Sequence, residues 1–229
     1  MLFFKPEVLI PLLIAMLMSL TLHEWAHAWT AYMLGDNTAY HEGRVTLNPI
    51  AHLDPIGSLC FILSGGFGWA KPVPVNSNRF KNPRRDDTLV TAAGPISNIL
   101  LGTVSGIAYY ALIKNGYFIK PSSSLVRLGG EVLQMLVTVN FVLAFFNLIP
   151  LFPLDGSHIA TNLMPLNQAY QFKRFNQSYG PMVLMGLLVL GMMNLPLPNG
   201  ATFDPLGWMI WPPAKFCIQM VAKFAFWIF

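Results

Sequence analysis

Long apolar segments separated by short polar stretches dominate the hydrophobic pattern of this chain. A helix needs about 20 predominantly apolar residues to cross the hydrocarbon core of a bilayer. Three segments have that length, and they cover residues 7–34, 88–113 and 132–150. The first ends in a mixture of polar and aromatic residues suited to a membrane surface, so we interpret it as an uncleaved span and not as a signal peptide.

Shorter apolar segments add further membrane elements. Residues 55–68 are too short and too glycine-rich for a span, so a re-entrant or extended segment is expected over residues 55–80. Residues 181–195 are short unless preceding residues extend them, and Pro212 and Pro213 are expected to interrupt the apolar tail. The pattern predicts an all-α polytopic membrane protein with about four to six membrane elements.

Composition agrees with this fold class. Hydrophobic residues make up 54% of the chain and charged residues only 10%, against roughly 25% charged in soluble domains. The mean hydropathy is +0.51. The net charge of +4 comes from few residues and includes no long basic stripe, so the lipid bilayer is the expected surrounding and nucleic acid is not an expected partner.

The distribution of basic residues predicts the topology. Five of them lie within residues 71–87: Lys71, Arg79, Lys81, Arg84 and Arg85. The positive-inside rule places this stretch on the cytoplasmic side of the cell membrane. The span 88–113 then leaves the cytoplasm, and the span 132–150 returns to it. If residues 55–68 only dip into the bilayer, the end of the first span is cytoplasmic too.

A metal-binding motif lies near the end of the first span. His23 and His27 are one helical turn apart and can bind one zinc ion from the same face, while Glu24 can reach a water bound to that ion. Ionisable residues at membrane depth are rare and are usually functional. The alternative is that three polar residues merely face water at a helix end.

Asp155 is the candidate for a third zinc ligand. It follows the third predicted span, on the same side of the membrane as the histidines, and Pro150, Pro153 and Gly156 end the helix around it. Two histidines and one carboxylate leave a coordination position open for water, as in hydrolytic zinc sites. The competing interpretation is that Asp155 and Gly156 form only a turn.

These residues predict peptide-bond hydrolysis. Zinc lowers the pKa of a bound water towards roughly 7, and Glu24 can accept the proton as general base and pass it to the leaving amine. A membrane-spanning substrate would have to unwind locally, because its helical hydrogen bonds protect the peptide bond. The alternative function is a metal-binding transport or accessory protein that does not hydrolyse its partner.

Three motifs in this order resemble the site-2 protease family of intramembrane zinc metalloproteases. They are His23-Glu24-Trp25-Ala26-His27, Gly94-Pro95-Ile96-Ser97-Asn98, and the run from Asn147 to Gly156. Four further matches resemble its small bacterial branch, which lacks a PDZ domain: Gly35-Asp36, Gly43-Arg44, Leu47-Asn48-Pro49 and His52-Leu53-Asp54-Pro55.

The resemblance implies one zinc per chain on His23, His27 and Asp155, with Glu24 as the base. It also places Asn147 near the reacting carbonyl, and it implies a transmembrane protein as the substrate. His158 stands where relatives often have arginine. A single domain over residues 1–229 is expected, with a catalytic core over about 7–160 and C-terminal membrane elements over about 179–229.

Other polar residues allow two interpretations. Asn98 lies on a face of small residues with Gly94, Gly102 and Gly106, and it could face the catalytic site or bond helices together. Asn140 shares a helix face with Asn147.

The remaining candidates are a proline-rich segment, two histidines and two cysteines. Residues 71–76 could form an edge strand that holds an unwound substrate, with a hinge at Gly65, Gly66 and Gly68, or an ordinary loop. His41 and His52 are expected to be structural, since they lack helical spacing with His23. Cys60 and Cys217 are expected to be buried thiols, although a disulfide between them stays open.

Overall fold

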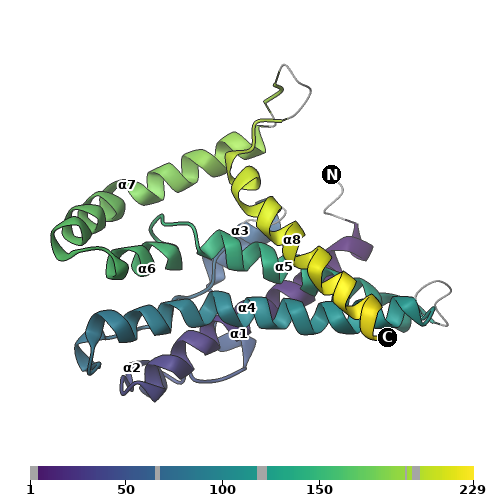
Figure 1. Cartoon of the computed structure of the whole chain (residues 1–229), viewed down its shortest axis with the longest axis horizontal. Coiled ribbons are helices and arrows are strands. Elements are labelled where there is room, and N and C mark those ends of the chain that lie inside the picture. Colours follow the sequence, from purple (N-terminus) through teal and green to yellow (C-terminus); the bar gives the residue numbers. More distant parts are fainter. Residues whose placement is uncertain (1–4, 65–67, 118–122, 194, 198–201) are drawn as a thin grey trace.

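Helices form almost all of the regular structure in the computed structural model (Figure 1). The structure describes residues 5–64, 68–117, 123–193, 195–197 and 202–229. Within those ranges it contains no strand, only two isolated bridges. The prediction of an all-α fold is therefore confirmed.

Three helices are long and apolar enough to cross a membrane within the described ranges. They are α1 (Pro6–Met33), α4 (Pro83–Lys114) and α5 (Ser124–Asn147), and they match the three predicted spans. These helices pack against one another as one bundle. Because proline has no amide hydrogen to satisfy and its φ suits a first helical turn, Pro6 and Pro83 make favourable helix starts.

Glycines let α4 approach its neighbours closely. A Cβ atom added at Gly106 would lie 2.6 Å from Cγ1 of Val221, and one added at Gly102 would lie 3.2 Å from Cβ of Asn140. No larger residue fits at Gly106 without moving Val221, which confirms the predicted packing role of this small-residue face.

The C-terminal helices form an open V above the bundle: α7 (Leu166–Met192) and α8 (Pro205–Ile228) (Figure 1). The expected interruption at Pro212 and Pro213 is wrong, because α8 runs continuously through both. Two missing amide hydrogen bonds weaken the helix, but α8 packs against α4 and α5 along its length, and Ala214, directly after the prolines, is fully buried. Helix α7 extends through Pro181, but the residues before that proline are largely polar and include Lys173 and Arg174, so they lengthen the helix and not its apolar segment.

Short helical elements connect α1 to α4. They are α2 (Thr38–His41), η2 (Pro49–Ala51), α3 (Pro55–Ser64) and η3 (Ser77–Arg79). Of these, α3 and η3 lie within residues 55–80, the region expected to be re-entrant or extended. Residues 71–76 form no strand, and the nearest pairing is an isolated bridge between Leu53 and Ala70. Pro72 and Pro74 favour an extended backbone at the residues before them, and Asn76 has extended dihedral angles (φ −111°, ψ 94°). Gly65 and Gly66 of the proposed hinge lie outside the described residues.

Buried polar residues hold the extended segment 71–76 at both ends. At its start, the buried Arg44 donates from Nη2 to the Lys71 carbonyl (2.6 Å) and from Nη1 to the Pro72 carbonyl (3.0 Å). At its end, Asp36 accepts from the Asn76 amide (2.6 Å). Burial opposes ionisation of Asp36, but hydrogen bonds from Thr38 and Asn76 outweigh it and hold the pKa of this carboxyl below its ordinary value.

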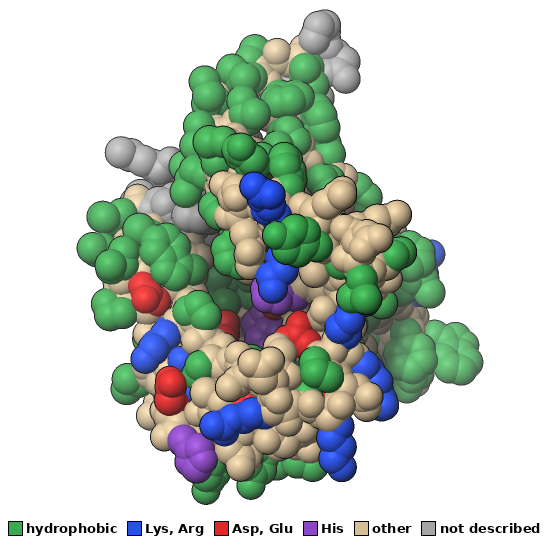
Figure 2. Space-filling view, turned by 90° about the vertical axis from the view of Figure 1, so that its left-hand side faces the viewer, with side chains coloured by type: hydrophobic (Ala, Val, Ile, Leu, Met, Phe, Trp, Pro, Cys, Tyr) green, Lys and Arg blue, Asp and Glu red, His purple; other side chains and the backbone are tan. Residues whose placement is uncertain are grey.

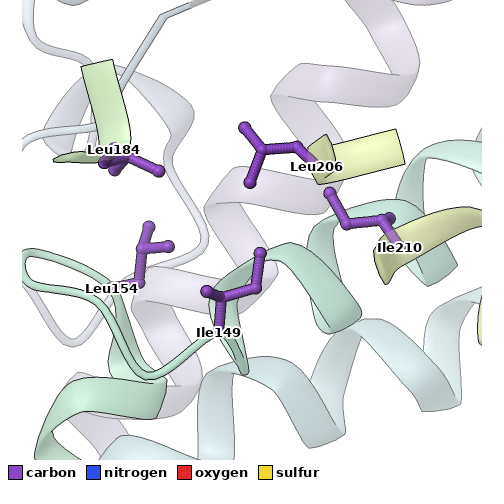
Figure 3. Packing of buried hydrophobic residues seen from close by; sticks show 5 residues of the cluster. All are labelled: Ile149, Leu154, Leu184, Leu206 and Ile210. Carbon is purple, nitrogen blue, oxygen red and sulfur yellow. The ribbon is translucent and has the colours of Figure 1, made fainter. Parts of the chain in front are cut away.

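A cluster of buried aliphatic side chains fixes the chain between α5 and α6 (Asp155–Leu163). It consists of Ile149, Leu154, Leu184, Leu206 and Ile210, and thus joins the connection before α6 to α7 and α8 (Figure 3). Leu154 directly precedes Asp155, so this packing limits the freedom of the acid's backbone.

Cys60 and Cys217 are both free thiols.

Candidate metal centre

Residues from two distant parts of the chain meet at the end of α1. His23 and His27 are both buried, with their Nε2 atoms 3.0 Å apart. Asp155, the first residue of α6, places Oδ2 3.2 Å from His23 Nε2 and Oδ1 3.5 Å from His27 Nε2. One ligand atom from each residue lies within 4.8 Å of the others. The structure therefore brings together the three predicted ligands.

Hydrogen bonds to the other ring nitrogens fix the histidine tautomers. His23 Nδ1 lies 2.7 Å from Asn98 Oδ1, and His27 Nδ1 lies 2.7 Å from the Val90 carbonyl. Both oxygens can only accept, so each neutral ring carries its proton on Nδ1 and presents a lone pair on Nε2. The short Nε2–Nε2 separation is therefore no hydrogen bond.

The donor set fits a zinc ion. Asp155 Oδ2 is buried and accepts no hydrogen bond, although a buried carboxylate oxygen is costly to leave unsatisfied. Two imidazole nitrogens and a carboxylate oxygen, none carrying a proton, face one point. Such groups repel one another unless a cation lies between them, and nitrogen and oxygen ligands of this kind suit zinc.

Asn98 connects the histidine pair to the helix bundle. Its Nδ2 donates to the Ser19 carbonyl (3.2 Å) and to Asn140 Oδ1 (2.8 Å), which leaves Oδ1 for His23. Asn140 in turn donates from Nδ2 to Ser19 Oγ (2.8 Å). This network joins α1, α4 and α5. Both interpretations of Asn98 therefore apply, because its side chain bonds helices to one another and also orients a candidate ligand.

Gly94 makes room for both histidine rings. A Cβ atom there would lie 2.6 Å from His23 Cε1 and even closer to His27 Nε2. The sequence indicated a small residue for helix packing at this position. In the structure, what packs against Gly94 is the candidate metal site itself.

Asn176 of α7 holds the connection that leads to Asp155, and the sequence gave no reason to single it out. It is buried, accepts from the Phe152 amide (2.9 Å) and donates to the Pro150 carbonyl (3.1 Å). Gly180 lies one turn later, where a Cβ would be 2.6 Å from Asn176 Oδ1. No local sequence pattern could have identified it, because both of its partners are backbone groups of that connection.

A cavity of about 700 Å³ lies over the three candidate ligands. Glu24 and Asn147 both line it, as does the extended segment through Val73 and Val75. Figure 2 shows this hollow, with histidine and acidic side chains inside it and lysine or arginine side chains around its mouth. Asn147 donates from Nδ2 to the Leu143 carbonyl (3.0 Å), which uses one of its two amide hydrogens.

The other histidines lie apart from the ligand pair. His52 is buried and donates from Nε2 to the Thr46 carbonyl (2.8 Å), so its predicted structural role is confirmed. His41 is exposed and does not line the cavity. His158 does line the cavity, with its Nδ1 4.0 Å from Asp87 Oδ2.

Comparison with known proteins gives the family. The profile of Peptidase family M50 matches residues 122–191, a range that contains Asp155. YwhC of Bacillus subtilis, which is named as a zinc metalloprotease, is 38% identical over 211 residues, covering 91% of this chain and 88% of that relative. The chain belongs to peptidase family M50. No solved structure matches the chain at comparable stringency.

Two mycobacterial proteins are also similar to this M50 chain. Rip2 of Mycolicibacterium smegmatis, named as a zinc metalloprotease, is 33% identical over 61% of this chain and 52% of its own length. Rip2 of Mycobacterium tuberculosis H37Rv, with the same naming, is 31% identical over 84% of this chain and 70% of its own length.

Family membership confirms the resemblance to site-2 proteases that the three motifs indicated. The M50 protein is a zinc metalloprotease with apolar helices suited to a membrane. Family membership therefore favours the predicted protease over the alternative, a metal-binding transport or accessory protein without hydrolysis.

Proposed function

We propose that this M50 protein cuts peptide bonds within or near transmembrane segments of other membrane proteins, with one zinc per chain on His23, His27 and Asp155. One observation supports this proposal above all others. Three ligand atoms without protons, contributed by α1 and α6, face one another beneath a cavity that lies against a bundle of apolar helices. That is the arrangement that brings water and metal to a bond normally surrounded by lipid.

Glu24 is the group that moves the proton. When bound, zinc supplies Lewis-acid activation of water and of the substrate carbonyl. The Glu24 carboxylate lies next to His23 along α1 and lines the same cavity. It accepts a proton from the attacking water and donates it to the nitrogen of the leaving amine, so the base of the first step becomes the acid of the second.

Asn147 holds the substrate carbonyl. Its Nδ2 donates one hydrogen to the carbonyl one turn earlier in α5, and its second amide hydrogen has no described acceptor in the protein. That hydrogen is available to a carbonyl oxygen in the cavity, where a donor stabilises the negative charge that develops during hydrolysis.

The extended segment 71–76 binds the unwound substrate along the cavity. Among the residues that the structure describes, the amides of Val73 and Val75 have no hydrogen-bond partner, while both residues line the cavity. Arg44 holds the neighbouring Lys71 and Pro72 carbonyls, so the segment is kept extended without a strand on either side. A peptide paired with it would receive backbone hydrogen bonds in place of those lost from its helix.

Replacing Val73 with proline should weaken substrate binding, because proline removes the free amide while suiting an extended backbone. We expect KM to rise about 5- to 10-fold, the cost of roughly one hydrogen bond, with little change in kcat. Val73→Ala keeps the amide and is the matched control. A KM that changes equally in both variants would contradict backbone pairing. The measurement is steady-state cleavage of a purified substrate in detergent.

The cavity opens to the cytoplasmic side of the cell membrane. Arg84 lines it from α4 and Lys173 lines it from α7, and the exposed Lys71 lies in the chain between two lining residues, Ala70 and Pro72. Positive residues gather on cytoplasmic faces.

In right-side-out membrane vesicles, a single cysteine introduced at the exposed Lys81 should resist a membrane-impermeant thiol reagent until the vesicles are opened. The variant carries serine at Cys60 and Cys217, and immediate labelling would place the site on the other side.

Removal of zinc should abolish cleavage and its return should restore it. The purified protein is treated with a chelator, dialysed, and assayed on a membrane-protein substrate in vesicles before and after one equivalent of zinc. Activity should fall by at least about 100-fold and recover, since zinc supplies the activation that the side chains alone lack. Cleavage that persists in the metal-free protein would refute the proposed function.

A further inference from the structure

The first turn of α4 contacts the C-terminal end of α6. Arg84 Nη2 donates to the carbonyls of Thr161 (3.2 Å), Asn162 (2.7 Å) and Met164. The last carbonyls of a helix have no amide partners within it, and they lie at the negative end of the helix dipole. A guanidinium supplied from another helix therefore both satisfies and charge-stabilises this end of α6.

Asp87, less than one turn further along α4, makes a second connection to the same end. Its Oδ2 accepts from Asn162 Nδ2 (2.7 Å), and its Oδ1 accepts from Ser77 Oγ (2.9 Å). Ser77 begins η3, directly after the extended segment. One carboxylate thus bonds both to the helix that carries Asp155 and to the end of the segment that lines the cavity.

Helix α6 is a short rod with Asp155 at one end and these contacts at the other. It has nine residues, and Asn162 lies about 10 Å from Asp155 along the axis at 1.5 Å per residue. At the Asp155 end, Gly156 packs so closely that a Cβ would lie 2.5 Å from the Ile149 carbonyl oxygen. That end acts as a pivot, so the direction of α6 depends on how its far end is held.

We infer that Arg84 and Asp87 are positioning residues, which form an inter-helix clasp that seats α6 and so aims Asp155 at the two histidines of α1. Neither side chain bonds to a candidate ligand within the described structure. Metal sites tolerate displacements of only about 0.2 Å in ligand distance, so a small tilt of α6 about its pivot is enough to weaken the third bond. The inference rests on the proposed ligand set.

The test is the zinc affinity of the purified full-length protein in detergent, measured by competition with a chromophoric zinc chelator. Arg84→Ala should weaken zinc binding about 10-fold or more, within the 10- to 100-fold range of residues that orient metal ligands. Asn162→Ala, which removes the bond to Asp87 and suits a helix, should weaken it by a smaller factor. Arg85→Ala is the matched control, since the adjacent Arg85 is exposed and has no described partner, and it should bind zinc like the original protein.

Thermal unfolding of the zinc-free proteins distinguishes an effect on the orientation of Asp155 from an effect on the stability of the fold. If Arg84→Ala lowers the melting temperature but binds zinc with the original affinity, the clasp only supports the fold and the inference is overturned. If Arg84→Ala does not fold, Asn162→Ala decides in the same way. Asp155→Ala distinguishes the two proposals. If Asp155→Ala loses zinc while Arg84→Ala and Asn162→Ala bind zinc normally, only the clasp is refuted. If Asp155→Ala still binds zinc fully, the ligand set itself is refuted.

Discussion

Glu24→Gln should reduce cleavage by about 10²- to 10⁴-fold, the usual contribution of a positioned general base, while the protein still binds one zinc per chain. Glutamine keeps the size and the polarity of the side chain but cannot accept the proton of the attacking water. The candidate ligands His23, His27 and Asp155 make their own hydrogen bonds and close contacts, none of which involves Glu24 in the structure. Activity and metal content should therefore separate in this variant.

The experiment measures both quantities on the same purified sample, with single-turnover cleavage for activity and elemental analysis for zinc. Glu42→Gln is the matched control, because Glu42 is exposed beyond α2 and does not line the cavity. Normal cleavage by Glu24→Gln would exclude this carboxylate as the base. Loss of zinc together with activity would instead assign it a role in holding the metal.

Gly94→Ala should destroy zinc binding and activity together. The added methyl group would overlap both imidazole rings, with 2.6 Å to His23 Cε1 and a shorter contact to His27. These rings cannot withdraw without breaking their hydrogen bonds to Asn98 and Val90. We expect zinc affinity to fall by at least about 100-fold, the upper range for changes that disturb the orientation of metal ligands.

Gly129→Ala is the control for the general effect of replacing a helical glycine. Gly129 lies in α5 with nothing within 4 Å of an added Cβ, so this change should leave zinc binding intact and slightly stabilise the helix. Zinc titration and circular dichroism of both variants distinguish a disturbed site from a disturbed fold. An unchanged zinc affinity in Gly94→Ala would mean that the imidazole rings can move aside to accommodate the added methyl group, contrary to the structure.

Hydropathy alone predicted the three spanning helices, since the absence of water in a bilayer forces long apolar segments to satisfy their own backbone. The helix-breaking tendency of proline gave a wrong prediction at Pro212 and Pro213, because local propensity does not include the packing of α8 against α4 and α5. The meeting of His23 with Asp155 could be predicted from ligand chemistry and topology without any knowledge of the packing between helices.

The parts of the site that sequence could not predict depend on how helices are rotated against one another. Gly94 was identified as small, but only the structure places it against the two imidazole rings. Asn176 donates to a loop carbonyl and Arg84 to helix-end carbonyls, and such carbonyls look alike in any sequence. Backbone acceptors carry no residue signature, so such contacts become visible only in three dimensions.

The distance along the chain between the histidines and Asp155 has a consequence for biosynthesis. A ribosome completes His23 and His27 first and must add 128 more residues to include Asp155. In that interval α4 and α5 follow α1 into the membrane, so the chain carries two histidines and a base there but no acid to complete the ligand set. With the ligands proposed here, a nascent or prematurely terminated chain has an incomplete metal site, and neighbouring proteins in the membrane are safe from it until α6 has formed.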